Sequence, residues 1–210
     1  MHVHILPLGP IEANCVILWD DPSKAWIVDP GADVESVKAF LESNDLKPSL
    51  VIATHGHFDH IGAIPDLLNA YEGLKFHIGP GDEAMLGQPD NAWPPYYPCR
   101  AKPANVMADL SDGTMLDEGG LCAKIIATPG HTPGGVCLYF EKENLLITGD
   151  TLFAGSCGRT DFPGGSMPTL MASLARLAVL PQETRVISGH GPETSIGQEL
   201  VVNPYLQDVM

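Results

Sequence analysis

The sequence predicts an α/β fold in which two mixed β-sheets pack face to face, with helices outside them. Short apolar segments typical of strands are followed by a segment with helical spacing, and this order occurs twice along the 210 residues. That length gives enough volume for a sizeable core. We find no internal repeat and no low-complexity segment, so we expect residues 1–210 to form a single domain.

The first half contains the first set of elements. Strands are expected over 2–6, 15–18 and 26–28, with a turn at 20–23. Val34, Val37 and Leu41 recur at helical spacing and predict a helix over 34–42, with Asp33 as its N-cap. The remaining elements are a buried strand over 49–53, a helix over 63–71 and a strand over 75–78.

The second half repeats this order after an irregular segment. Residues 79–110 predict no regular element, and the proline-rich run 93–98 excludes one there. A long irregular loop is either functional or a surface connection packed by its own aromatics. Strands then follow over 115–116, 122–127, 136–140 and 145–148, and after them a helix over 169–177 and a strand over 185–188.

The composition excludes several classes of partner. Asp and Glu total 26 against 11 Lys and Arg, which gives a formal net charge of −15. Binding to nucleic acid or to an anionic membrane requires a basic surface, so we expect neither partner. No stretch has the length of a membrane span, the N-terminus does not resemble a signal peptide, and the five cysteines form no C-x-x-C pair. We therefore expect a cytoplasmic protein with reduced thiols.

A cluster of candidate metal ligands lies between a predicted strand and a predicted helix. The segment 54–60, THGHFDH, holds His55, His57, Asp59 and His60. A loop at this position projects its side chains into a crevice at the sheet edge. Imidazole and carboxylate groups together suit zinc or iron. The segment therefore predicts a metal site.

Three further candidates occupy similar loops after apolar strands. They are His131 in PGHTPG, Asp150 in TGD and His190 in GHG. Seven ligands exceed the needs of one tetrahedral ion, whereas two ions can share them and leave one position for a bridging hydroxide. The other histidines are expected to be ordinary surface or core residues: His2, His4 and His77.

These motifs together resemble the metallo-β-lactamase superfamily over nearly the whole chain. The run DTLFAGSCGRTDFPGG at 150–165 and the ending HGPETSIGQELVVNPYL resemble the short, single-domain glyoxalase II-like proteins, the hydroxyacylglutathione hydrolases. The resemblance implies a four-layer αββα sandwich and hydrolysis of S-lactoylglutathione to lactate and glutathione. Long glyoxalase II enzymes carry a C-terminal helical domain that grips glutathione. We expect that domain to be absent, because the chain ends about twenty residues after His190.

The resemblance also implies a role for each ligand. His55, His57 and His131 would hold the first metal. Asp59, His60 and His190 would hold the second, with Asp150 bridging both. We expect zinc, although iron and manganese also fit such ligands. A bridging hydroxide would attack the thioester carbonyl, and a thiolate (pKa ~8.5 for the free thiol) would leave with little proton assistance. Asp59 is also a candidate catalytic group that orients the hydroxide.

Candidate substrate-binding residues come from two loops. Arg159, nine residues past Asp150, is the leading partner for a substrate carboxylate. Further candidates lie in or just after the aromatic segment: Tyr96, Tyr97, Arg100 and Lys102. Each cation would equally suit a structural ion pair. Because the chain is acidic, long-range steering opposes an anionic glutathione conjugate, and the pocket would have to compensate locally. The sequence does not indicate the oligomeric state.

Other activities remain as alternatives. Persulfide dioxygenases of the superfamily share a GRTDF-like segment, here 158–162, but bind one iron, so the complete second ligand set favours hydrolysis. A lactonase keeps the bridging aspartate, whereas several β-lactamase subclasses have cysteine or serine where this chain has Asp150. A sensing module that holds metal without turnover is the non-catalytic alternative. The charge disfavours a nuclease.

Overall fold

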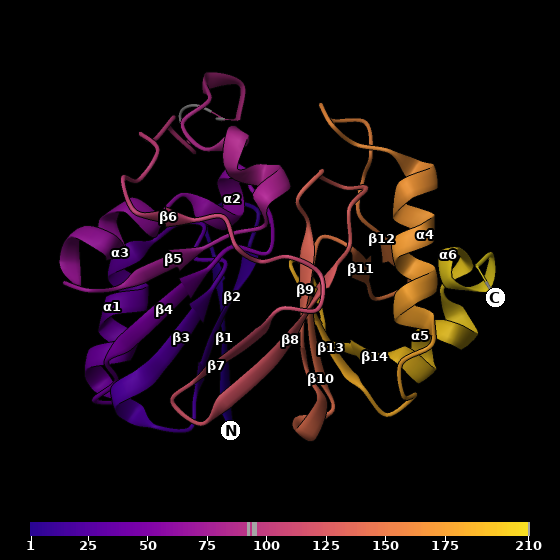
Figure 1. The fold of residues 1–210 in the computed structure, drawn as a ribbon, viewed down its shortest axis with the longest axis horizontal. Coiled ribbons are helices and arrows are strands. Elements are labelled where there is room, and N and C mark those ends of the chain that lie inside the picture. Colours follow the sequence, from indigo (N-terminus) through magenta and orange to yellow (C-terminus); the bar gives the residue numbers. More distant parts are fainter. Residues whose placement is uncertain (92, 94–95, 210) are drawn as a thin grey trace.

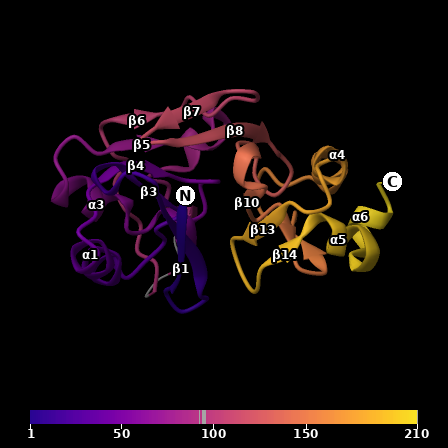
Figure 2. The same ribbon diagram turned by 90° about the horizontal axis from the view of Figure 1, so that it is seen from below.

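The chain folds into two six-stranded β-sheets that pack face to face, with helices on the outer side of each (Figure 1, Figure 2). The computed structural model describes residues 1–91, 93 and 96–209. Apolar side chains from both sheets meet between them, including Leu18 and Trp26 from the first and Ile125 and Leu138 from the second. The layers therefore run helix, sheet, sheet, helix, which confirms the predicted four-layer sandwich.

The first sheet is built from the N-terminal half in the strand order β1-β2-β3-β4-β5-β6. The pairs β1–β2 and β2–β3 are antiparallel, and β3 to β6 are parallel. The strand bounds are β1 His2–Leu8, β2 Ala13–Trp19, β3 Ala25–Val28, β4 Pro48–Ile52, β5 Lys75–His77 and β6 Val106–Met107. The helices α1 Val34–Ser43 and α3 Ile64–Ala70 cover the outer face, where Val37 and Leu67 pack against Ile27 and Phe76.

The second sheet has the order β14-β13-β10-β9-β8-β7 and is antiparallel except for the parallel pair β10–β13. The strand bounds are β7 Met115–Glu118, β8 Leu121–Ala127, β9 Val136–Phe140, β10 Leu145–Gly149, β13 Arg185–Ser188 and β14 Thr194–Ser195. Its outer face is covered by α4 Met167–Ala178, α5 Ile196–Val202 and α6 Pro204–Gln207, with Leu170 and Leu174 packed against Cys137 and Val186.

Short elements connect these layers. A small hairpin, β11 Leu152–Phe153 and β12 Ser156–Cys157, follows β10, and α2 Phe58–Ile61 follows β4. The 3-10 helices are η1 Pro22–Lys24, η2 Pro80–Met85, η3 Pro89–Asn91 and η4 Glu141–Glu143. A bilayer-spanning helix must be both long and strongly apolar, and none of the described helices meets both requirements.

Two predictions about these elements need correction. The segment 79–110 is not wholly irregular, because it contributes η2, η3 and the sixth strand of the first sheet. Residues 93–98 include an isolated bridge between Trp93 and Tyr97, while Pro94 and Pro95 lie outside the described residues. Asp33 is at the N-cap position of α1 as predicted, but its side chain makes no capping hydrogen bond: its backbone is left-handed (φ 47°), and its carboxylate accepts a hydrogen bond from Gly9 N instead.

The helix predicted over 63–71 is confirmed as α3 Ile64–Ala70, but one short element before it was not predicted. This helix, α2, begins at Phe58, inside the metal motif. Asp59 and His60 therefore lie on a helical turn rather than in the loop. Helical spacing of apolar residues could not reveal this turn, because these two residues are polar and face the site rather than the core.

Candidate metal centre

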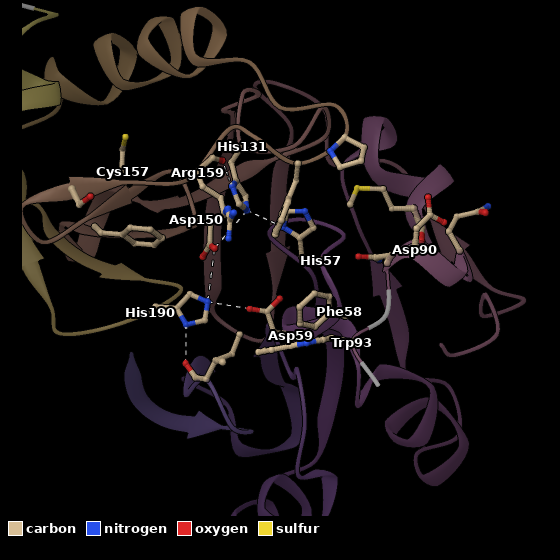
Figure 3. A pocket seen from close by; sticks show the side chains of 18 residues that line it. His57, Phe58, Asp59, Asp90, Trp93, His131, Asp150, Cys157, Arg159 and His190 are labelled. Carbon is tan, nitrogen blue, oxygen red and sulfur yellow. Dashed lines mark hydrogen bonds and ion pairs between the residues drawn. The ribbon is translucent and has the colours of Figure 1, made fainter. Parts of the chain in front are cut away.

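The seven candidate ligands gather at one edge of the sandwich, and Figure 3 shows five of them converging. They come from five places: His55 and His57 after β4, Asp59 and His60 on α2, His131 after β8, Asp150 after β10, and His190 after β13, the strand parallel to β10. Backbone hydrogen bonds join these loops, from Val136 N to Thr54 O at 2.8 Å and from Gly189 N to Gly149 O at 2.8 Å. Loops distant in sequence are thereby held together.

The seven side chains form three overlapping groups. Each group offers nitrogen or oxygen atoms that lie within 4.8 Å of one another. The groups are His55, His57 and His131; His55, His60 and Asp150; and Asp59, His60 and His190. The middle group shares a member with each of the other two, so the arrangement is one continuous cluster.

Distances within the cluster are those of groups that share a common partner. His57 Nδ1 lies 2.8 Å from His131 Nε2, and His190 Nε2 lies 3.1 Å from Asp59 Oδ2. His60 Nε2 is 3.5 Å from both Asp59 Oδ2 and Asp150 Oδ1. Asp150 Oδ2 is 3.5 Å from His131 Nε2.

Three inward-facing atoms test whether these residues fit metal ions. His55 Nε2, His60 Nε2 and Asp150 Oδ1 are buried and have no hydrogen-bond partner among the described residues. An unsatisfied buried polar atom is costly, so three in one cluster need an explanation. A pair of divalent cations would supply it, because imidazole nitrogen and carboxylate oxygen are ligands that zinc and iron accept. The residues present therefore fit a two-metal site.

Two glycines allow the loops to approach this closely. A Cβ on Gly189 would lie 2.2 Å from Asp150 Oδ1 and 2.8 Å from His60 Cε1. Gly149 has a φ of +48°, and a Cβ there would lie 2.2 Å from Thr54 Oγ1. Larger residues at either position would push the ligand loops apart.

Polar groups outside the cluster fix the orientation of several rings. Asp29 Oδ2 accepts a hydrogen bond from His60 Nδ1 at 2.9 Å. Two other rings are held by backbone carbonyls. Arg159 O accepts a hydrogen bond from His131 Nδ1 at 2.6 Å, and Ile11 O accepts one from His190 Nδ1 at 3.2 Å. Such outer partners fix which ring nitrogen faces a metal. Sequence reasoning missed Asp29, although its place directly after a buried strand is a usable signal.

A second missed residue, Asp82, ties two ligand loops together. It is fully buried and accepts hydrogen bonds from Gly56 N at 2.8 Å, Gly134 N at 2.5 Å and Thr132 Oγ1 at 2.7 Å. Gly56 lies between His55 and His57, and Thr132 follows His131. The carboxylate therefore connects the two loops that supply the first ligand group. No sequence signal identified it, because it lies in the segment predicted to be irregular.

A third missed group supports the hairpin β11–β12. Glu199 is fully buried; its Oε2 accepts from Gly155 N at 2.7 Å and from Asn203 Nδ2 at 2.8 Å, and its Oε1 accepts from Thr194 Oγ1 at 2.6 Å. Asn203 Nδ2 also donates to Ser156 O at 2.9 Å. The hairpin follows Asp150 directly, so α5 and α6 hold the chain segment beside that ligand. Glu199 and Asn203 both lie in the C-terminal segment GQELVVNPYL, but the sequence does not show that they contact the hairpin.

The electrostatics of the cluster suit metal binding. Burial and the neighbouring histidines lower the pKa of His55 well below its ordinary value, and burial and His131 lower the pKa of His57 to about 3. Both rings are therefore neutral at physiological pH, the form that binds a metal. Burial alone would raise the pKa of Asp59, but His60 and His190 lower it overall, so this carboxylate is ionised. Burial raises the pKa of Asp150.

The cluster opens into a cavity of about 840 Å³ (Figure 3). Five of the seven candidate ligands line it, while His55 and His60 lie behind them. Its walls are largely apolar, with Phe58, Met85, Phe153 and Phe162 among the lining side chains. This volume is within the range of pockets that bind small molecules.

The predicted substrate-binding residues divide into two sets. Arg159 lines the cavity. The other four are not among its lining side chains: Tyr96, Tyr97, Arg100 and Lys102. Arg100 forms an ion pair with Asp66, and Lys102 Nζ lies 2.7 Å from Glu83 Oε1. Tyr97 is buried against Phe58, with ring centroids 4.8 Å apart, while Tyr96 is exposed.

The three histidines that we did not expect to bind metal lie outside the cluster. His2 stacks on Trp19 with ring centroids 5.1 Å apart, and His4 stacks on Phe40 at 4.0 Å. His77 is buried, and its Nδ1 lies 2.9 Å from Asp109 Oδ1. Packing accounts for His2 and His4, and a polar contact for Nδ1 of His77, whose buried Nε2 has no partner among the described residues.

Comparison with known proteins identifies the family. The model of the metallo-beta-lactamase superfamily matches residues 8–190. The hydroxyacylglutathione hydrolase GloC of Haemophilus influenzae is 35% identical over 223 residues, covering 98% of each chain. The crystal structure of the BLEG-1 B3 metallo-beta-lactamase superposes with a TM-score of 0.89 at 36% identity, covering 98% of this chain and 99% of that one. TTHA1623 in a di-iron-bound form gives a TM-score of 0.85 at 34% identity, covering 97% of this chain and 100% of that one. With the family model matching most of its length and its ligand loops converging as described, this chain belongs to the metallo-beta-lactamase superfamily of metal-dependent hydrolases.

Proposed function

We propose that this protein is a two-metal thioesterase, with S-lactoylglutathione as the first substrate to test. The observation that carries the proposal is the continuous cluster of three ligand groups, with unpartnered atoms of His55, His60 and Asp150 facing inward, beside an apolar cavity. The named activity of the GloC relative supports the choice of substrate.

The ligand roles follow the grouping of the side chains. We assign His55, His57 and His131 to one cation. We assign Asp59, His60 and His190 to the other, with Asp150 between the two. Two divalent cations supply an acidified water, whose pKa falls from ~15.7 to near ~7, and polarise the substrate carbonyl. Zinc is our first choice, and iron or manganese suits the same ligands.

The chain itself has two further tasks in this reaction. Asp59 is ionised and points into the cavity, so it can accept a hydrogen bond from the attacking water and orient it. The apolar walls, Phe58 and Phe162 among them, keep bulk water away from the reacting carbonyl. If Asp59 orients the water and holds a cation, Asp59→Ala will lower kcat and metal content together. Full activity at full metal occupancy would disprove both roles.

The leaving group decides between a thioester and an amide. A thiolate, with a pKa of ~8.5 for the free thiol, departs with little proton assistance, whereas an amine must be protonated. Among the described lining residues, Asp90 is the one carboxylate outside the ligand groups, and Cys157, whose pKa burial raises to about 11, is a poor acid. The lining therefore favours a substrate that needs no proton donor.

The test is thiol release from S-lactoylglutathione by protein of known metal content. Protein stripped with a chelator should be inactive, and reloading with zinc, iron or manganese in turn should restore activity in proportion to occupancy. His131→Asn should lose both metal and activity, by more than the roughly 10- to 100-fold that loss of an outer partner costs. The matched control is His2→Asn, which changes a histidine outside the cluster. Protein that holds two metal equivalents yet releases no thiol from any thioester would refute the proposal.

Hydrolysis of a β-lactam is a second candidate, favoured by the similarity to the BLEG-1 metallo-beta-lactamase. The same preparation, assayed with a chromogenic cephalosporin, should show a lower kcat/KM than with the thioester, because the amine leaving group lacks a proton donor in the described lining. A higher value with the cephalosporin would reverse the order. Oxygen uptake with a glutathione persulfide would instead indicate a dioxygenase.

A further inference from the structure

We propose that the cavity selects thioesters whose thiol portion carries no net negative charge, and that Asp90 and Asp161 set this preference. The inference rests on the proposed thioesterase function and narrows its substrate class. It concerns the part of the cavity lined by Asp90 and Arg159, where the tail of the leaving thiol would lie.

The single arginine of the described lining is already engaged. Arg159 Nε lies 2.7 Å from Asp161 Oδ1, and Arg159 Nη2 lies 2.6 Å from Asp161 Oδ2. These two parallel contacts occupy one bidentate edge of the guanidinium. The guanidinium carbon also lies 4.0 Å from the centroid of the Phe162 ring. An anionic tail would therefore meet an arginine whose positive charge is already balanced by the adjacent Asp161 carboxylate.

Outside the ligand groups, the rest of the described lining adds no positively charged side chain; its polar members, Gln88, Asn91 and Ser156, are uncharged. Described lining residues include no lysine and no second arginine, and they add the carboxylate of Asp90. No described cation forms an ion pair with Asp90. The lining also includes the apolar side chains of Trp93, Phe153 and Met85. A tail that is neutral gains contact with these walls without repulsion from Asp90.

The charge of the whole chain acts in the same direction. Its formal net charge is −15, so an approaching anion is repelled before it enters the cavity. Cations at the ligand cluster would attract an anionic tail as well, but that attraction is the same in the wild-type protein and in variants of Asp90 and Asp161, so a comparison of these proteins isolates the two aspartates. What differs between substrates is the charge of the tail, and the tail meets Asp90 and the Arg159–Asp161 pair.

The experiment compares three substrates that differ in tail charge. S-lactoylglutathione carries a net charge of about −1, its monoethyl ester about 0 and its diethyl ester about +1, by the ordinary ionisation of its groups. We expect kcat/KM for thiol release by the metal-loaded protein to rise along this series at low salt. About 0.5 M NaCl should flatten the rise, because it screens charges beyond a few ångströms.

Variants of the two aspartates separate tail charge from tail size. In Asp90→Asn and in Asp161→Asn, the ratio of kcat/KM for the acid over the monoester should increase about two- to fivefold, as expected for one exposed charge. In Asp161→Asn this increase in the ratio arises because the charge of Arg159 is no longer balanced. The double variant Asp161→Asn with Arg159→Gln should therefore show no increase. The control is Asp117→Asn on β7, outside the cavity, which changes the net charge equally and should leave the ratio unchanged.

The outcomes distinguish this inference from the function on which it rests. If neither these three substrates nor any other thioester releases thiol, the proposed thioesterase function fails and the inference fails with it; if another thioester reacts but the neutral and cationic esters do not, the function stands and the inference is wrong. If all three react but the wild-type protein favours the acid, or if the aspartate variants do not change the ratio, the thioesterase assignment stands and only the charge preference is wrong. A ratio that moves equally in Asp117→Asn would assign the effect to net charge, and would also refute the role of the two aspartates.

Discussion

The carboxylate of Asp29 joins His60 to the end of strand β4. Its Oδ2 accepts hydrogen bonds from His60 Nδ1 at 2.9 Å and from Thr54 Oγ1 at 2.7 Å, and its Oδ1 accepts from Thr54 N at 2.7 Å. All three residues are buried. One side chain at the end of β3 therefore sets both the orientation of a candidate ligand and the position of the loop that carries the other histidines.

Asp29→Asn should weaken binding of the second metal. The amide has one accepting oxygen in place of two, so it can accept from Thr54 N or from His60 Nδ1 but not from both. It also lacks the negative charge that orients the His60 ring. We expect metal affinity at this site to fall about 10- to 100-fold, as is typical for loss of an outer carboxylate. The backbone of Asp29 has a φ of 54°, a conformation that asparagine also adopts readily, so the fold should survive.

The measurement for Asp29→Asn is metal retention during titration with a competing chelator. The second equivalent should be released at lower chelator concentration than in the wild-type protein, while the first is retained more strongly. Glu42→Gln, an exposed acidic residue on α1, is the charge-matched control and should titrate like the wild-type protein. Identical curves for both variants would show that Asp29 does not position His60.

Asp82 offers a prediction about the first ligand group. In Asp82→Asn the amide nitrogen would face one of the donors, Gly56 N or Gly134 N, and leave it without an acceptor. A buried donor without a partner costs about 1–3 kcal/mol, so we expect the midpoint of thermal unfolding to fall by several degrees. Because the two loops would also separate, binding of the first metal should weaken.

Thr132→Val provides a graded comparison for Asp82. It removes one of the three hydrogen bonds and leaves both backbone donors paired, so its loss of unfolding free energy should be smaller. Thermal unfolding and metal content measured on both variants test this order. Equal stability of Asp82→Asn and the wild-type protein would mean that the carboxylate does not hold the loops.

The buried Glu199 predicts a local effect on the cavity wall. Glu199→Gln should leave either Thr194 Oγ1 or Gly155 N poorly paired and should loosen the hairpin β11–β12, whose Phe153 and Cys157 line the cavity. Hydrogen exchange at the Gly155 amide should become faster, because exchange reports local opening. Thioester kcat/KM should fall while metal content stays at the wild-type level.

Gln198→Ala is the control for Glu199→Gln, because it changes the neighbouring, exposed residue of the same helix. If Gly155 exchanges at the wild-type rate in Glu199→Gln, the hairpin is held by other contacts. If metal is lost as well, the variant disturbs Asp150, and its effect on activity cannot be assigned to the cavity wall.

The sequence was sufficient to predict the layers and to predict that the candidate ligands would gather, for local reasons. Buried strands such as β4 and β9 are short continuous apolar runs, and His55 to His60 lie within six residues. The other ligands each follow an apolar strand, and strand ends meet at the edges of a sheet. These signals need no knowledge of which distant segments touch.

The supporting residues could not be predicted in this way. Asp82 meets Thr132 across 50 residues, and Glu199 meets Gly155 across 44 residues. In the sequence each is one acidic residue among 26, and nothing local separates a buried carboxylate from a solvated one. The hairpin β11–β12 was missed for another reason, because strands of two residues are too short to show alternation.

A final prediction concerns how pH affects an ion-pair group between the two sheets. Lys24, next to β3, and Lys75 on β5 lie 3.2 and 3.5 Å from the carboxylate of Glu118 on β7, so this group joins the first sheet to the second. Partial burial alone would raise the pKa of Glu118, but the Lys24 hydrogen bond and the two ammonium groups lower it overall. A carboxyl group with a lowered pKa in the folded state stabilises the fold when ionised.

Because the pKa of Glu118 is lowered in the folded state, its contribution to the free energy of unfolding decreases as the pH falls. The contribution of Glu118 should be fully present above the ordinary glutamate pKa of ~4.3 and be lost as the pH falls through the lower, folded-state value. Urea unfolding of the wild-type protein and of Glu118→Gln should therefore differ by up to about 1 kcal/mol near pH 7, the upper range for a partly exposed pair, and converge at acidic pH. Glu143→Gln, an exposed residue of η4, should show no such convergence. A difference for Glu118→Gln that stays constant with pH would mean that the substitution acts through packing, because only an ionised carboxylate attracts the two lysines.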